Sequence, residues 1–166
     1  SPKEPVTPNY AATQPFIAYT LKTVYLYKSA NFTKHERITI YPKAMRQNRP
    51  MFKVTGYVRD RNGYLRYKVR DINKHTKNYG KTGYLTTRVE FVQNAYYQTK
   101  PFKIRVFNSK GLNEYRNGNL SGKVKHDKKG TVLKVKKLAE HDLSTRFVLS
   151  NGHFVSANKR LVISKK

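Results

Sequence analysis

Apolar and polar residues alternate with period two along most of the chain, as in Val24–Tyr27, Phe52–Val54 and Leu133–Val135. Short runs rich in β-branched and aromatic residues are bounded by Gly, Asn and Pro, which is typical of strands. No stretch sustains the 3.6-residue apolar stripe of an amphipathic helix. Asn62-Gly63 and Asn151-Gly152 predict hairpins with type I′ turns, because Asn-Gly accepts the positive φ angles of that turn. The pattern predicts an all-β protein.

Several of these runs recur in the same order, which indicates an internal repeat. Three blocks reappear about 80 positions later: Val24–Ser29 as Ile104–Ser109, Phe52–Val54 as Leu133–Val135, and Arg66–Val69 as Arg146–Leu149. Two more reappear 70 positions later: Tyr84–Thr87 as Phe154–Ala157, and Phe91-Val92 as Leu161-Val162. The change of offset predicts that the first copy carries about ten extra residues within Asp71–Gly83.

The repeat divides the chain into three predicted parts. Four of the seven prolines lie within the first fifteen residues, which favours an extended tether over residues 1–19. A first barrel repeat then covers residues 20–98, with its insertion near 71–83, and a second covers residues 99–166. Each copy has room for about five short strands, so we expect two tandem small SH3-like barrels.

Positive charge narrows the choice of partner. Lys and Arg number 35 against nine acids, a formal net charge of +26, which concentrates polyanions at the surface. Nucleic acid, an anionic membrane and a phosphate-bearing wall polymer all fit. The absence of cysteine excludes disulfides and thiolate chemistry. No run is long enough for a membrane span, and a chain that starts at Ser1 without a visible signal peptide is expected to be an excised piece of a longer protein.

Catalysis is not predicted. The nine carboxylates are dispersed, and Glu140-His141-Asp142, the one local cluster of titratable groups, is interpreted as a polar turn. The five histidines show no metal-ligand spacing. We therefore expect neither an enzyme nor a metal or cofactor site.

Binding is assigned to basic and aromatic residues in both copies. An arginine guanidinium can donate two parallel hydrogen bonds to one phosphate group. Lys134 and Lys136 would project to one side of a strand, away from Leu133 and Val135. For Arg66 and its counterpart Arg146, a structural role at the barrel mouth is the alternative. We expect tyrosines to contact glycan faces in the first copy and lysines to contact phosphate in the second. The predicted polymer-binding residues are Tyr64, Arg66, Lys68, Arg70, Tyr79, Lys125, Lys128, Lys129, Lys134, Lys136 and Arg146.

Particular segments resemble a known family. Gly130–Lys137, Ser144–Gly152 and Phe154–Lys159 are similar to the short C-terminal repeats of lactobacillus surface proteins. Met51–Tyr57, Leu65–Asp71 and Gly80–Thr86 resemble the wall-binding repeats of lactobacillus surface-layer and surface-layer-associated proteins. The resemblance implies SH3-like barrels, an extracellular location in the cell wall or surface layer, and non-covalent attachment of a larger protein to teichoic or lipoteichoic acid or an accessory polysaccharide.

Two other functions remain open on the sequence. Basic charge interleaved with aromatics also suits single-stranded nucleic acid, which small barrels bind. An adhesin for sulfated host glycans would use the same surface. The sequence leaves open the identity of the polymer, whether both repeats bind, and the oligomeric or lattice state.

Overall fold

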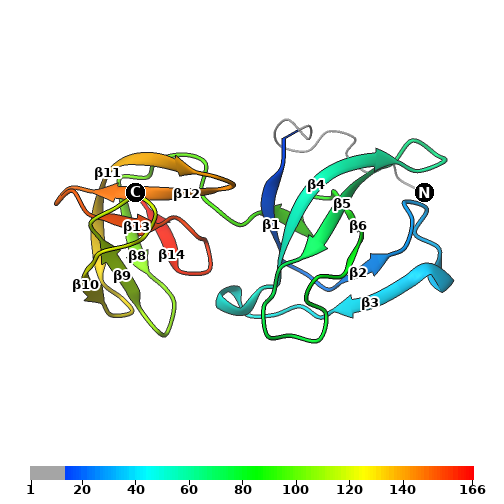
Figure 1. Cartoon of the computed structure of the whole chain (residues 1–166), viewed down its shortest axis with the longest axis horizontal. Helices are drawn as coiled ribbons and strands as arrows, with labels where there is room; N and C mark the ends of the chain where they lie inside the picture. Colours follow the sequence, from blue (N-terminus) through cyan, green and yellow to red (C-terminus); the bar gives the residue numbers. More distant parts are fainter. Residues whose placement is uncertain (1–13) are drawn as a thin grey trace. The chain divides into compact units, whose positions relative to one another are not determined.

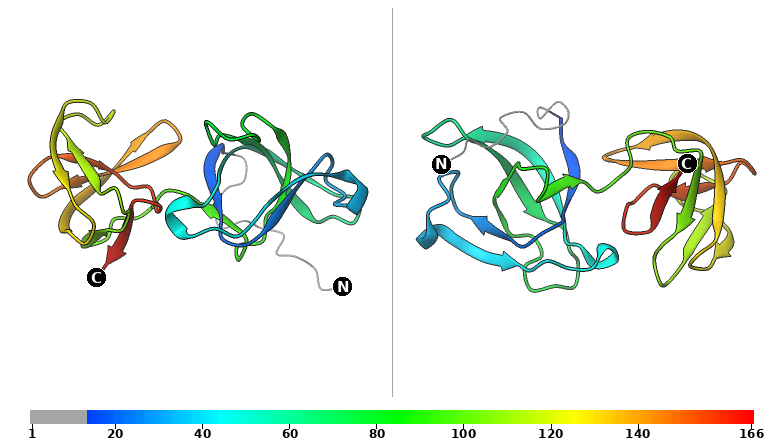
Figure 2. Two further views of the ribbon diagram at one scale, coloured as in Figure 1. Left: turned by 90° about the horizontal axis from the view of Figure 1, so that it is seen from below. Right: turned by 180° about the vertical axis from the view of Figure 1, so that it is seen from behind.

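The computed structural model describes residues 14–166. It is all-β, as expected, and divides into two compact units, one ending at Asn94 and the other beginning at Ala95 (Figure 1). Each unit is one curled, barrel-like antiparallel sheet of seven strands rather than the five we expected (Figure 2). The predicted tether up to residue 13 lies outside the described residues.

In the first unit, the strands follow the order β3-β2-β6-β5-β4-β1-β7 across the sheet. Two short 3-10 turns, η1 (Lys34–Glu36) and η2 (Arg46–Asn48), flank β3. The strands are β1 (Phe16–Thr20), β2 (Val24–Tyr27), β3 (Arg37–Tyr41), β4 (Met51–Arg59), β5 (Leu65–Asp71), β6 (Thr82–Thr86) and β7 (Val92–Asn94).

The second unit has the matching order β10-β9-β13-β12-β11-β8-β14, so each strand has a counterpart seven places earlier. This correspondence gives the predicted repeat a structural basis. The strands are β8 (Lys103–Val106), β9 (Leu112–Tyr115), β10 (Lys123–Asp127), β11 (Val132–His141), β12 (Ser144–Leu149), β13 (Phe154–Ser156) and β14 (Val162–Lys165).

Four of the five predicted block matches join equivalent strands, and one is wrong. Val24–Ser29 begins with β2, whereas Ile104–Ser109 begins in β8, which is the counterpart of β1. Register shows the true pairing: Ala18 lies opposite Phe52 just as Ile104 lies opposite Leu133. The misalignment arose because β1 lies inside the segment predicted as tether.

The predicted boundaries also change. β1 begins at Phe16, so residues 16–19 belong to the first sheet and not to a tether. The second unit starts at Ala95 rather than at residue 99, because Lys159 donates its amide to the Ala95 carbonyl and Tyr97 donates to the Ala157 carbonyl. Tyr97 also packs against the second core, with its ring 5.8 Å from that of Phe147.

Both Asn-Gly hairpins form, but neither turn is type I′. Only the glycine has positive φ in each turn, +86° at Gly63 and +86° at Gly152, whereas type I′ requires two such residues. Gly63 donates its amide to the Asp60 carbonyl and Gly152 donates to the Leu149 carbonyl. The insertion lies where expected, with residues 72–81 joining β5 to β6 and only residues 150–153 joining β12 to β13.

Candidate functional site

Arg66 is buried, so its assignment as a polymer-binding residue is wrong. It is 5% exposed, and its guanidinium carbon lies 3.8 Å from the centre of the Phe32 ring. Its Nε donates to the Ala30 carbonyl at 3.0 Å, and Nη2 lies 3.3 Å from Oδ2 of the buried Asp60 carboxylate. Arg66 therefore has a structural role, which was the alternative interpretation from the sequence.

Arg146 has the same role in the second unit and is likewise corrected. It is 8% exposed, and its Nε donates to the Gly118 carbonyl at 3.1 Å while Nη1 donates to Ser144 Oγ at 2.8 Å. Gly118 follows β9 as Ala30 follows β2. Each arginine therefore fastens the loop after the second strand of its unit.

Most of the other predicted residues are exposed. Lys68 and Arg70 project from β5, and Tyr79 in the β5–β6 loop is 47% exposed. Tyr64 is only half-exposed, and its ring centre lies 5.5 Å from the guanidinium carbon of Arg66. The predicted lysines of the second unit are exposed on β10, β11 and the turn between them: Lys125, Lys128, Lys129, Lys134 and Lys136.

A bulge in β11 increases the exposure of this lysine segment. The register slips between Val135 and Lys137, so Lys136 and Lys137 are both exposed while Val135 stays buried. β4 has a register shift at the equivalent point, between Val54 and Gly56. Lys125 is less free, since its Nζ lies 3.8 Å from Asp127 Oδ1.

Strand pairing places three lysines side by side. Lys134 of β11 lies directly opposite Lys103 of β8, which lies opposite Lys165 of β14. Lys134 is exposed and Lys103 and Lys165 are half-exposed, and Arg105, two residues along β8 on the same face as Lys103, is exposed. Directly opposed side chains have Cβ atoms roughly 4.5–5.5 Å apart, and like charges in such pairs repel. We call Lys103, Lys134 and Lys165 the lysine row.

Few acids offset this charge at the surface. Four of the nine carboxylates have side chains that are at most 5% exposed: Asp60, Asp71, Glu114 and Asp127. Asp60 holds Arg66, and Asp71 accepts a 2.7 Å hydrogen bond from the Tyr41 hydroxyl. The solvent-facing surface is therefore more one-sidedly positive than the formal net charge suggests.

Two of these acids, Glu114 on β9 and Asp127 on β10, are buried neighbours inside the second unit. Burial, together with the neighbouring Glu114 carboxylate, raises the pKa of Asp127 to about 6. Burial opposes ionisation of Glu114, but hydrogen bonds from Asp127, Asn151 and His153 outweigh burial and lower its pKa to about 2. The pair lies within the fold, and Glu114 is 0% exposed.

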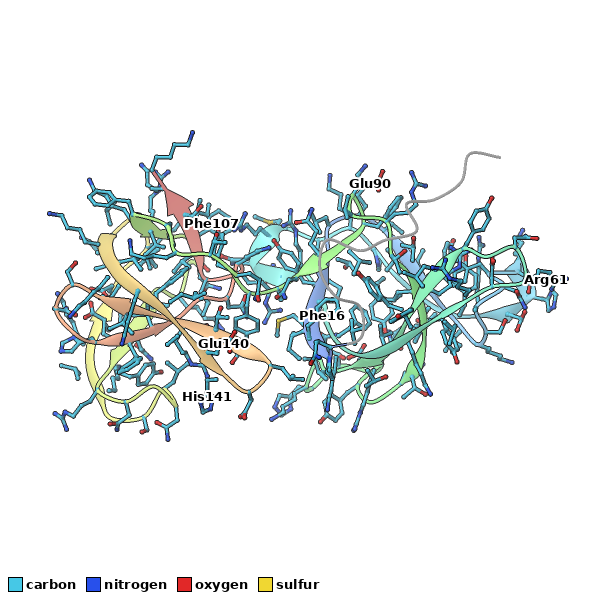
Figure 3. All side chains as sticks on the ribbon, turned by 90° about the horizontal axis from the view of Figure 1, so that it is seen from above. Phe16, Arg61, Glu90, Phe107, Glu140 and His141 are labelled. Atoms are coloured by element: carbon cyan, nitrogen blue, oxygen red, sulfur yellow. The ribbon has the colours of Figure 1, made fainter. Side chains whose placement is uncertain are left out.

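Of the cluster interpreted as a polar turn, Glu140 and His141 (Figure 3) are the last residues of β11, and only Asp142 lies in the turn. Ser144 Oγ donates to the His141 carbonyl at 2.8 Å, and Asp142 has a positive φ of 53°. Within residues 14–166, no group of three or more His, Asp or Glu side chains is arranged to hold a metal ion.

A pocket of about 190 Å³ opens in the first unit. Tyr27 stacks on Phe32 with ring centres 4.1 Å apart, and Arg37 lies 3.7 Å above the Tyr25 ring. Arg88 completes the wall and lies 5.3 Å from the centre of the Phe91 ring. The residues that line this pocket include Tyr25, Tyr27, Phe32, Thr86, Arg88 and Phe91.

A second pocket, of about 240 Å³, lies in the second unit. His126 Nδ1 lies 2.6 Å from Asn113 Oδ1, and Asn113 Nδ2 donates to the Tyr115 hydroxyl at 3.2 Å. These contacts form a polar row along β9 and β10. The residues that line this pocket include Lys110, Asn113, Tyr115, Leu120, Ser156 and Leu161.

Sequence reasoning missed the pockets and two members of the lysine row. Lys103 and Lys165 lie far from Lys134 in the sequence, and only the register of three strands brings them beside it. The pocket residues come from strand ends and loops that no short motif joins. A correct alignment of the β2 and β9 sequences would have paired Tyr27 with Tyr115. It would then have shown that the two copies share pocket-lining positions.

Comparison with known proteins adds one match. Residues 96–162 match a family model described as a domain of unknown function, DUF5776. The match covers most of the second unit and less than half of the chain. No curated protein matches the chain. Within residues 14–166, no helix has the length and apolar character needed to cross a bilayer.

Proposed function

We propose that this chain is a non-catalytic binding module that attaches a larger surface protein to an anionic polymer of the bacterial cell wall. The lysine row carries the proposal. Three ammonium groups on adjacent strands repel one another in the absence of a ligand, and a phosphate-bearing polymer laid across the sheet would neutralise them.

Burial of the acids supports the same conclusion. Four carboxylates are used inside the fold, so the surface retains few anions that would compete with a ligand. Glu114 and Asp127 are 0% and 4% exposed, so this pair does not flank an open cleft, as a hydrolytic pair must. The sequence resemblance favours a wall polymer of the teichoic or lipoteichoic acid class over nucleic acid.

Co-sedimentation with purified Gram-positive cell walls tests the proposal. Retention is expected on intact walls and should fall strongly on walls stripped of teichoic acid. Soluble teichoic acid should displace the chain at lower concentration, in phosphate equivalents, than poly-U or heparin. Equal retention on stripped walls would overturn the proposal, and stronger displacement by poly-U would replace it with nucleic-acid binding.

A triple variant tests the lysine row itself. Lys103→Gln, Lys134→Gln and Lys165→Gln together should weaken retention, whereas the matched control Lys34→Gln, Lys43→Gln and Lys74→Gln removes the same charge from exposed sites of the first unit. If both triple variants weaken retention equally, only net charge matters and the row is not the site.

A further inference from the structure

The two pockets occupy the same place in the two repeats. Pairing of Tyr27 with Tyr84 in the first unit matches pairing of Tyr115 with Phe154 in the second. This register makes Tyr27 equivalent to Tyr115, and Tyr25 equivalent to Asn113. In the same way Phe32 corresponds to Leu120, five residues after the shared tyrosine in each case. Two diverged copies have therefore kept a hollow at one topological position.

The loop that closes each pocket has the same unusual backbone in both units. Phe32 has a φ of 48° and Leu120 a φ of 60°, values that non-glycine residues adopt at an energetic cost. The buried arginines hold these loops, Arg66 through the Ala30 carbonyl and Arg146 through the Gly118 carbonyl. Each fold thus maintains a strained residue in order to place an apolar side chain at the pocket wall.

The walls combine a flat apolar surface with cations. In the first unit, aromatic rings from β2, its following loop and Phe91 line the hollow, and Arg88, Arg37 and Lys22 lie beside those rings. Arg88 contacts Glu90 at 3.3 Å, but both side chains are more than 40% exposed, and such a surface pair is easily exchanged. In the second unit, Lys110 and His126 supply the basic groups.

Size restricts the occupant. Both cavities are below the roughly 300–1,000 Å³ of pockets that enclose drug-sized ligands, so each suits one small unit. An aromatic or leucine wall packs against the C–H face of a sugar ring, the tyrosine hydroxyl hydrogen-bonds to ring hydroxyls, and the cation pairs with an acidic substituent.

We propose that each pocket binds one sugar unit that carries a phosphate or carboxylate group, so that the chain reads its polymer at two equivalent subsites. This inference rests on the proposed function, because it names the repeating unit that the wall polymer presents. It also changes the expectation that tyrosines of the first copy contact the glycan while lysines of the second contact phosphate. In this proposal both units, and not the first alone, contact a sugar ring.

Amide NMR titration of the full chain with glucose 6-phosphate tests the inference, with glucose and inorganic phosphate as separate probes. Saturable shifts are expected at Tyr25 and Tyr27 in one pocket and at Asn113 and Tyr115 in the other. Inorganic phosphate should act mainly on the lysine row, and glucose should act weakly at the pockets. Pocket amides that do not respond to the sugar phosphate, or that respond equally to inorganic phosphate, overturn the inference.

Charge removal at each pocket sharpens the test. Arg88→Gln should weaken glucose 6-phosphate binding at the first pocket by roughly tenfold and leave the second unchanged, and Lys110→Gln should do the reverse. Arg59→Gln and Arg116→Gln are matched controls at exposed positions of the same units. Loss of affinity at both pockets from either substitution would indicate a general charge effect and overturn the inference.

The outcome separates this inference from the proposed function. Retention on teichoic-acid-bearing walls with silent pockets would leave the wall-binding proposal standing and remove the subsites. If the pocket amides shift with glucose 6-phosphate but the chain is not retained on walls, the subsites would stand and the wall-binding proposal would fall. The chain would then recognise a sugar phosphate without binding the wall polymer.

Discussion

Arg66 and Arg146 show how a cation in a highly basic protein can be reserved for structure. Each guanidinium donates to the carbonyl of a loop that follows a strand two positions away in the sheet, and Arg66 also contacts Phe32 and Asp60. The guanidinium is planar and carries several N–H donors in fixed directions, so it makes these contacts at the same time. A lysine ammonium cannot do so. The exposed Lys68 and Arg70, on the same strand as Arg66, are left for solvent or ligand.

Replacement of the buried arginine should therefore affect stability. Arg66→Gln leaves the Asp60 carboxylate buried without its counter-charge, and we expect a loss of about 3 kcal/mol of unfolding free energy in the first unit. Arg70→Gln is the matched control on the same strand and should change stability by less than about 0.5 kcal/mol. Urea unfolding followed by circular dichroism measures both, and equal effects would contradict the structural role.

The Glu114–Asp127 pair predicts a pH dependence in the second unit. The native state keeps the Asp127 proton up to about pH 6, whereas the ordinary value for the group is 3.8. The native state therefore binds more protons than the unfolded state within this window, and stability falls as pH rises through it. The lowered pKa of Glu114 acts in the opposite sense, because its contribution is lost as pH falls below its ordinary value of 4.5 toward 2.

Hydrogen exchange at the β9 and β13 amides of the full chain measures this effect. Protection should increase from pH 7 to pH 5 after correction for intrinsic exchange rates, by about 1 kcal/mol. Asp127→Asn keeps the shape of the side chain and removes the second carboxylate, so protection should then change little across this range. A variant with the same pH dependence as the original chain would exclude the pair as its source.

At the scale of single elements, the inserted β5–β6 loop is held to the first sheet by specific hydrogen bonds. Asn73 donates its amide and its Nδ2 to Asp71 Oδ1, and its Nδ2 also donates to the Met51 carbonyl. Its Oδ1 accepts from the Met51 amide at 2.8 Å. One side chain thus joins the start of β4 to the end of β5 and fixes where the loop leaves the sheet.

Asn73→Ala should free this loop. Loss of these hydrogen bonds beside the buried Asp71 is expected to reduce the stability of the first unit by about 1–3 kcal/mol. Limited proteolysis should show faster cleavage within residues 74–81, while Thr76→Ala, which removes one exposed hydrogen bond to the Asn73 carbonyl, serves as control. Unchanged cleavage in the Asn73 variant would show that other contacts hold the loop.

The elements also show what sequence pattern can and cannot predict. Alternation identified β2, β4 and β11, in which buried and more exposed residues alternate over the segments used, and Asn-Gly located two hairpins. β1 was missed because Phe16 directly follows a proline-rich segment, and without β1 the alignment of the first strands slipped. Burial of Arg66 and Glu114 depends on loops and strands distant in sequence, and the lysine row depends on register between strands, so neither follows from local pattern.

At the scale of the whole molecule, binding should be governed by charge and divided between the two units. The affinity of a polyanion falls with salt in proportion to the number of ionic contacts. The lysine-row triple variant should therefore show a log–log salt slope shallower by roughly 2 than that of the original chain, measured as retention on walls between low and physiological salt. An unchanged slope would mean that the row makes no contact with the polymer.

The matching strand order of the two units has a consequence for how this protein can change over time. Each unit has its own core and its own pocket, so damage to one leaves a chain that still folds around the other. A duplicated arrangement of this kind relaxes selection on either copy. Substitutions such as tyrosine against asparagine at residues 25 and 113, or phenylalanine against leucine at 32 and 120, can then accumulate until the two copies prefer different variants of one polymer.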